Sequence, residues 1–119
     1  MDKKKEDRFV ELLMKTGIQK NIARAFAFIA GREETTSRNI EDNTRLRQPE
    51  VSIATNKLRS TGWIDKRDIK KEGKGRPVHG YSLKKPIDDI IAEIEEKEKG
   101  KVKDIQDNLK KLKKLTSTL

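Results

Sequence analysis

The sequence predicts a mostly helical α+β fold with a small antiparallel sheet, and three observations support this. Apolar residues recur at helical spacing through the first sixty positions. Two strand-like segments, 63–69 and 78–83, flank a glycine-containing turn. From Pro86 onward the pattern is helical again. Only 32% of the 119 residues are hydrophobic, so we expect part of the chain to be extended or covered by a partner.

Two helices are expected before residue 32. The first covers residues 5–16, where Phe9, Leu12 and Leu13 are at helical spacing. The second covers residues 20–30, where four apolar residues share a face: Ile22, Ala25, Phe26 and Ile29. Each helix is followed by a glycine, which is a natural position for a helix to end.

A short strand and a short helix are expected next. Residues 35–37 are β-prone and suit an edge strand. Ser37 or Asn39 is expected to cap a helix that continues to about Asn43 and turns Ile40 inward. These two elements lead into a turn at 44–47.

A fourth helix is expected from Gln48, because Pro49 suits the first helical position and Gly62 suits the end. Its inward side is expected to carry Val51, Ala54, Thr55 and Leu58. With the two strands that follow, the order of elements is that of a winged helix-turn-helix with helices added at both ends.

Residues 20–84 resemble archaeal and bacterial winged-helix transcriptional regulators of the MarR, ArsR and TrmB-like kind. Three segments carry the resemblance: Pro49–Ser52, Leu58–Ile64, and Gly75–Pro77 leading into Tyr81–Leu83. It implies a regulator that binds a pseudo-palindromic site in double-stranded DNA as a homodimer. The chain then divides into an N-terminal helix (1–19), a DNA-binding domain (20–84) and a C-terminal helical dimerisation extension (85–119).

Positive charge is concentrated in the same part of the chain. Residues 45–76 carry ten Lys and Arg against four Asp and Glu, an excess of six of the formal +9. A clustered basic field favours a polyanion through counterion release and faster encounter. A solvated surface on a lysine-rich protein is the alternative interpretation.

The fourth helix supplies the residues predicted to read DNA in the major groove. Gln and Asn side chains can bind adenine in a bidentate way, Ser suits a base edge or a phosphate, and Lys suits guanine or a phosphate. Ile53 either meets a thymine methyl or packs against a neighbouring element. The predicted set is Gln48, Pro49, Ser52, Ile53, Asn56, Lys57 and Arg59.

The turn and the wing supply the residues predicted to grip the backbone. Glycines allow close approach to phosphates, and an arginine beside them suits a narrow, A·T-rich minor groove. The alternative is a solvated loop. The predicted set is Arg45, Arg47, Lys70, Lys71, Lys74, Gly75 and Arg76.

The sequence gives little support for a disulfide, a metal site, a catalytic site or a membrane span. The chain has no cysteine and one histidine, His79, so neither a disulfide nor a metal cluster of N and S ligands is expected. No nucleophile–base arrangement or Walker-type loop is present, so we expect no catalysis and no cofactor. No apolar run approaches the length of a membrane span, and a cytoplasmic, nucleoid-associated protein is expected. The sequence does not specify a small-molecule effector.

The C-terminal segment carries two apolar stripes that suit a coiled-coil dimer. They do not continue one another as heptads, so we expect Gly100 to break or kink the helix, or the seam to rotate. A helix folded back on its own domain is the alternative. In a two-fold dimer the recognition helices would lie about 34 Å apart. The predicted interface consists of both stripes. The first stripe is Ile87, Ile90, Ile91 and Ile94, and the second stripe is Val102, Ile105, Leu109 and Leu112.

A second function also fits the sequence. A winged helix can serve as an interaction subunit of a larger assembly, with its basic face on a protein or RNA and without sequence-specific DNA binding. Such a subunit would show no preference among duplexes and no dimer.

Overall fold

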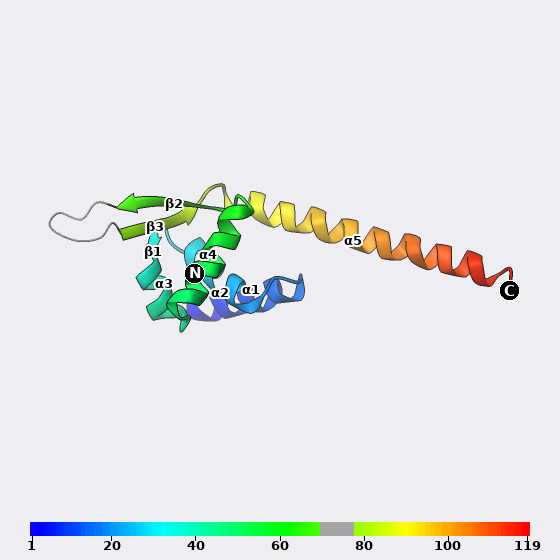
Figure 1. Cartoon of the computed structure of the whole chain (residues 1–119), viewed down its shortest axis with the longest axis horizontal. Helices are drawn as coiled ribbons and strands as arrows, with labels where there is room; N and C mark the ends of the chain where they lie inside the picture. The colour runs from blue at the N-terminus through cyan, green and yellow to red at the C-terminus, as the bar shows by residue number, and fades with distance from the viewer. Residues whose placement is uncertain (70–77) are drawn as a thin grey trace. The chain divides into compact units, whose positions relative to one another are not determined.

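A computed structural model of the chain describes residues 1–69 and 78–119. It confirms the predicted fold class of helices with a small antiparallel sheet (Figure 1). Residues 1–87 and 88–119 form two units. The elements, in chain order, are α1 (Lys3–Lys15), α2 (Lys20–Ala30), β1 (Thr35–Thr36), α3 (Ser37–Thr44), α4 (Gln48–Ser60), β2 (Ile64–Ile69), β3 (Val78–Leu83) and α5 (Ile87–Thr116).

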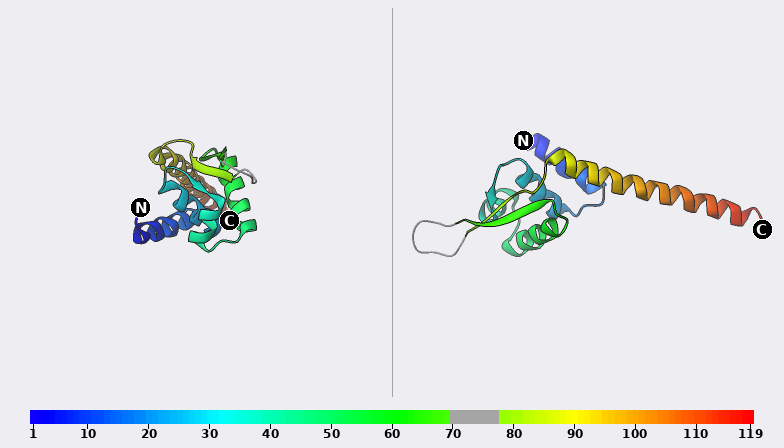
Figure 2. Two further views of the ribbon diagram at one scale, coloured as in Figure 1. Left: turned by 90° about the vertical axis from the view of Figure 1, so that its left-hand side faces the viewer. Right: turned by 90° about the horizontal axis from the view of Figure 1, so that it is seen from above.

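Helix α2 lies at the centre of the first unit. It contacts α1, α3, α4 and β3, and six of its eleven residues are buried: Ala23, Ala25, Phe26, Ala27, Phe28 and Ile29. The alanines let neighbouring elements approach closely, while Phe26 fills the space between them. The Phe26 ring centroid lies 6.0 Å from that of Phe9 and 5.3 Å from that of Trp63. Figure 2 shows helices α1–α4 gathered on one side of the sheet.

The ends of the helices follow from local residues, with one correction to the sequence prediction. Gly17 and Gly62 have φ of +93° and +79°, a conformation that favours glycine after a helix. The cap of α3 is Thr36, not Ser37 or Asn39. The chain leaves β1 with Thr36 still extended, and its Oγ1 accepts a hydrogen bond of 3.1 Å from the Asn39 backbone N–H.

The three strands pair in the order β1-β3-β2, all antiparallel. Gly80 in the central strand faces Arg67 of β2, and a Cβ at Gly80 would lie 2.8 Å from Ile69 Cδ1 and 2.9 Å from Glu34 Cδ. The absent side chain therefore leaves room for Glu34 to cross the sheet. There Glu34 accepts two hydrogen bonds from Arg67, of 2.5 Å from Nε and 2.8 Å from Nη2.

The Glu34–Arg67 pair shifts the ionisation of both groups. The hydrogen bond from Arg67 holds the pKa of the Glu34 carboxyl below its usual value, and the same bond raises the pKa of Arg67. Because the folded-state pKa of Glu34 is lowered, its stabilising contribution is present above the ordinary carboxyl pKa. The contribution is lost as the pH falls through the lowered value.

Helix α5 runs without interruption from Ile87 to Thr116, so the expected break at Gly100 is wrong. A glycine costs about 1 kcal/mol in a helix interior. Many good helix formers on both sides of Gly100 outweigh that cost. The 30-residue helix is visible in Figure 1.

Continuity of the helix also changes how the two apolar stripes relate. Ile91 and Val102 are eleven residues apart, as are Ile94 and Ile105. Eleven residues make three turns plus roughly 20° of rotation in a straight α-helix. The stripes therefore share one face of α5, and the offset in heptad register is an eleven-residue step in an unbroken helix.

No helix among the described residues is both long enough and apolar enough to cross a membrane.

Two glycine substitutions are expected to have opposite effects on stability. Gly80→Ala forces its new methyl against Ile69 and the Glu34 carboxylate, so we expect the free energy of unfolding to fall by about 1 kcal/mol. Gly100→Ala meets no atom within 4 Å and gains helix propensity, so we expect a rise of up to about 1 kcal/mol. Urea titration followed by circular dichroism measures both. Equal stability of Gly80→Ala and the parent would show that Glu34 moves aside without cost.

Candidate nucleic-acid interface

Helix α4 has a buried side and an exposed side that agree with the sequence prediction. Val51, Ala54, Thr55 and Leu58 are buried. All seven residues predicted to read DNA are exposed: Gln48, Pro49, Ser52, Ile53, Asn56, Lys57 and Arg59.

The exposed side of α4 forms a continuous polar surface with one apolar residue. At 100° per residue, Gln48, Ser52, Asn56 and Arg59 fall within roughly 80° of one another. Ile53 stands beside them with 65% of its surface exposed. In the described part of the chain Ile53 is therefore not packed against a neighbouring element, contrary to that alternative.

The turn between α3 and α4 presents two arginines by anchoring the residue between them. Leu46 is buried, while Arg45 and Arg47 on either side are exposed. Arg45 ends α3 in the left-handed region, with φ of +61°. A residue other than glycine in that conformation is strained, so the turn is held by its surroundings. Burial of Leu46 is one such constraint, because it directs both neighbours toward solvent.

Glu50 has a structural role at the start of α4. Its Oε1 accepts a 2.9 Å hydrogen bond from the backbone N–H of Arg47, and its Oε2 accepts another of 2.9 Å from Asn21 Nδ2 on α2. The first bond caps α4 and the second ties the start of α4 to α2. The signal in the sequence was the acid three residues after the capping position.

The described parts of the wing strands leave one cation free. Arg67 is bound to Glu34, and Asp68 lies 2.8 Å from His79 Nδ1 across the strand pair. Lys66 is exposed and has no ion-pair partner among the described residues. Five of the residues predicted for the wing lie outside the described part of the chain and stay predictions: Lys70, Lys71, Lys74, Gly75 and Arg76.

The cations around α4 are available to a ligand. Within residues 1–69 and 78–119, Arg45, Arg47, Lys57 and Arg59 have no carboxylate partner. Each therefore presents a full positive charge to solvent. Four unpaired cations around a polar helix face suit a surface that carries regularly spaced negative charges.

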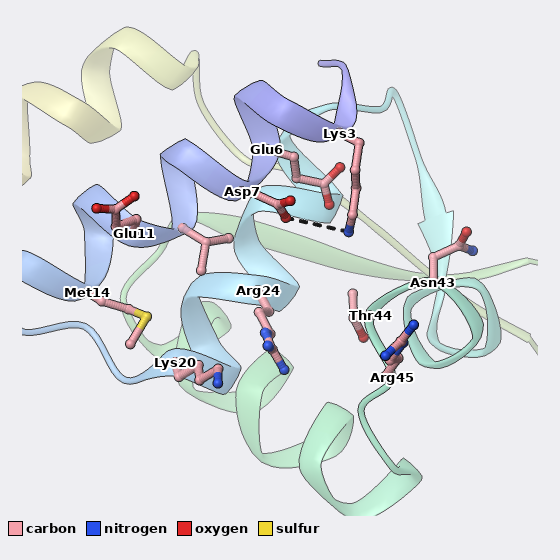
Figure 3. A pocket seen from close by; sticks show the side chains of 11 residues that line it. Lys3, Glu6, Asp7, Glu11, Met14, Lys20, Arg24, Asn43, Thr44 and Arg45 are labelled. Atoms are coloured by element: carbon pink, nitrogen blue, oxygen red, sulfur yellow. Dashed lines mark ion pairs between the residues drawn. The ribbon is translucent and has the colours of Figure 1, made fainter.

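A hollow of about 460 Å³ opens beside this surface, between α1, α2 and the α3–α4 turn (Figure 3). Glu6, Asp7 and Glu11 line it from α1, and Lys20, Arg24 and Arg45 line it from the other side. The two rows face each other without a direct ion pair, since Asp7 bonds Lys3 and Glu11 bonds Arg8 and Lys15 of its own helix. Its walls are therefore mixed in charge.

The described residues show no group of three His, Asp or Glu side chains positioned to hold a metal ion.

The residues predicted for dimerisation fall into two sets. Ile90 is buried, and its place in a dimer interface stays a prediction. Ile87 and Ile94 are half-buried, and Ile91 is partly exposed. The later stripe is open to solvent, with exposed fractions of 51% to 59% at Val102, Ile105, Leu109 and Leu112.

A helix-turn-helix followed by an antiparallel strand pair, with β1 completing the sheet, defines a winged-helix domain. Solved structures of that fold resemble this one. TrmBL2, described as an archaeal chromatin protein with a novel mode of DNA binding, aligns with a TM-score of 0.63 and 20% identity over 92% of this chain. This chain spans 40% of the length of the TrmBL2 chain.

Two further structures share the fold. NadR, solved in complex with 4-hydroxyphenylacetate, aligns with a TM-score of 0.55 and 16% identity, covering 87% of this chain and 71% of its own. NMB1585, a MarR family regulator from Neisseria meningitidis, aligns with a TM-score of 0.50 and 16% identity, covering 94% and 87%. No protein-family model and no curated protein sequence matches the chain. At these identities the likeness establishes the winged-helix fold.

Removing the Glu50 carboxylate is expected to destabilise the fold. Glu50→Ala loses both the cap of α4 and the bond to Asn21, so we expect the free energy of unfolding to fall by about 1–2 kcal/mol. Ser52→Ala, two residues away on the exposed face, is the control and should stay within about 0.5 kcal/mol of the parent. Urea unfolding measures both. Equal effects of the two substitutions would contradict the structural role of Glu50.

Proposed function

We propose that this protein is a transcriptional regulator that binds double-stranded DNA in a sequence-dependent way, with α4 in the major groove. The observation that carries the proposal is the exposed face of α4, where groups able to read bases stand among unpaired cations. TrmBL2, which shares the fold, is described as binding DNA, and this supports the proposal of DNA binding. Such a protein acts on the chromosome, so we place it with the nucleoid in the cytoplasm.

Phosphate contacts supply the sequence-independent part of the affinity. Arg45 and Arg47 precede α4 and flank the groove edge in this proposal, while Lys57 and Arg59 lie further along the helix. None of the four loses an ion pair on binding, because none has a carboxylate partner among the described residues. Each contact releases condensed counterions, so the affinity should depend steeply on salt.

Base contacts come from the first three turns of α4. Gln48 and Asn56 offer the donor–acceptor pair that adenine accepts in the major groove, and Ser52 lies between them on the same face. Ile53 adds an exposed apolar surface that suits a thymine methyl. Together these residues favour an A·T-containing site. The basic segment at 70–77 would add backbone or minor-groove contacts through Lys70, Lys71, Lys74, Gly75 and Arg76.

A second copy of the chain is part of the proposal. Val102, Ile105, Leu109 and Leu112 make an apolar stripe on an otherwise charged helix, at the spacing of a coiled coil. Exposure of such a stripe to water is unfavourable. Burying it against the same stripe of a second copy removes that exposure. A homodimer would present two α4 helices to DNA.

Two substitutions on α4 should separate affinity from specificity. We expect Arg47→Ala to weaken binding to every duplex and to lower the salt slope by about one, because it removes a phosphate contact. Asn56→Ala should cost about 1–3 kcal/mol on the preferred duplex and little on an unrelated one. Fluorescence anisotropy over a salt series, on a duplex obtained by random-duplex selection, measures both.

Lys4→Ala on α1 is the control for lost charge outside the site. Binding of the parent protein that does not respond to salt, or that is equal on selected and unrelated duplexes, would overturn sequence-dependent DNA binding. It would favour a role as an interaction subunit.

A charge placed in the α5 stripe should separate the two copies. Leu109→Asp puts a carboxylate in the proposed seam, so we expect the protein to become monomeric at micromolar concentration. Gln106→Asp adds the same charge three residues away, off the stripe, and should stay dimeric. Size-exclusion chromatography with light scattering measures both masses. A parent protein that runs as a monomer would contradict the homodimer.

A further inference from the structure

Charge is divided unevenly along α5. Residues 88–99 contain six acids and two lysines, a net charge of −4. Residues 101–114 contain six lysines and two aspartates, a net charge of +4. Gly100 stands at the boundary. The second unit of the chain is thus an acidic half-helix followed by a basic half-helix, with one apolar stripe running along both.

The helix macrodipole explains only part of this division. Acids near the start of a helix and cations near its end are favourable, but the effect is confined to the first and last turns. In α5 the division extends through the middle of the helix, where Glu95, Glu96 and Glu98 lie on one side of Gly100 and Lys101 and Lys103 on the other. The interior charges need a different explanation.

Ion pairs within the helix leave much of this charge unmatched. Glu95 bonds Lys99 at 2.7 Å, and Glu98 bonds Lys101 at 3.0 Å, both close to the middle of the helix. Among the described residues, four lysines nearer the C-terminal end have no carboxylate partner: Lys110, Lys111, Lys113 and Lys114. In the described part of the chain, Asp88 and Asp89 of the acidic half form no ion pair either.

We propose that α5 pairs with α5 of a second copy in antiparallel orientation, so that the acidic half of each helix lies along the basic half of the other. This rests on the homodimer of the proposed function and adds its orientation. In a parallel pair, the acidic halves of the two helices would face each other, and so would the two basic halves. Opposite orientation turns both repulsions into attractions.

The seam itself disfavours the parallel pair. The eleven-residue step that joins Ile94 to Ile105 leaves Glu98 as the seam residue between Ile94 and Val102. In a parallel pair Glu98 would face its own copy, which gives a layer of like charge in the seam. In an antiparallel pair with Val102 opposite Ile105, Glu98 meets Leu109 of the second copy, and its aliphatic stem can pack there.

The same alignment matches the remaining apolar residues. It brings Leu112 of one copy beside Ile94 of the other, and Thr116 beside Ile91. In a shorter overlap, the stripe at 102–116 of one copy would pair only with the same stripe of the second copy. That alignment would bring the two basic halves together. The charge pattern therefore selects the longer overlap, which is centred between residues 103 and 104.

One pair of charges flanks this seam. Glu95 and Lys113 are eighteen residues apart, or five full turns, so they project from the same flank of α5. In an antiparallel pair the same flank of each helix faces that of the other. In this alignment Glu95 of one copy and Lys113 of the second lie within one residue of the same level. The pair occurs twice by symmetry.

Antiparallel pairing has a consequence for DNA binding. The first residue of the acidic half lies at one end of the pair, and its copy lies at the other. With about 1.5 Å per residue and a full overlap, the two starting points are about 45 Å apart along the pair. The two winged-helix units thus leave the pair further apart than the single DNA turn expected from a compact two-fold dimer.

Disulfide trapping in the full-length chain tests the orientation, and the absence of native cysteine makes it unambiguous. The single variants Ile91→Cys and Thr116→Cys should not cross-link, while the double variant should form a covalent dimer under mild oxidation. The control is Ile91→Cys with Lys114→Cys, since residue 114 projects away from the stripe and should give at least tenfold less product. Non-reducing electrophoresis measures the covalent dimer.

The outcomes separate this inference from the proposed function. Cross-linking by each single variant would show a parallel pair, which overturns the orientation and leaves the homodimer standing. A protein that is monomeric by light scattering and cross-links in no variant would overturn both.

A charge exchange gives an independent test. Glu95→Lys alone and Lys113→Glu alone should each raise the dimer dissociation constant by roughly two- to tenfold, and the combined variant should restore it. Helicity by circular dichroism controls for loss of the Glu95–Lys99 bond. A combined variant weaker than either single one would overturn the antiparallel alignment.

Discussion

The packing around α2 is the constraint on which the first unit depends. This helix is buried on most of its surface, and α1, α3, α4 and β3 all contact it. Alanines allow close approach, and Phe26 contacts the rings of Phe9 and Trp63 at the same time. A change in volume at Phe26 would therefore shift the first helix and the start of the sheet together, because well-packed interiors transmit strain.

The contacts that hold the buried side of α4 determine which residues its exposed face presents. Leu46 is buried before the helix begins, and Glu50 binds both the Arg47 backbone and Asn21. These anchors set the rotation of α4, so that its polar residues and the two turn arginines face solvent. Binding residues held by such supports need little reordering when a ligand arrives, which reduces the entropic cost of association.

Helix α5 differs, because its uneven charge distribution and its exposed apolar stripe are explained by pairing with a second copy. A solitary helix gains nothing from an apolar stripe in water, and among the described residues Lys110 and Lys111 have no carboxylate partner on it. Both features become favourable in an antiparallel pair. The eleven-residue step from Ile91 to Val102 keeps the stripe on one face only because the helix is continuous.

The sequence by itself determined most of the element order and the exposed face of α4. Helical periodicity, Pro49 and the glycines that follow helices are local signals, and local signals survive folding. Only the tertiary structure decided that α5 continues through Gly100, that Ile90 is buried and that Ile53 is exposed. It alone showed that Gly80 makes room for Glu34 to reach Arg67, 33 residues away. Contacts between distant residues depend on how elements pack, and periodicity carries no information about that.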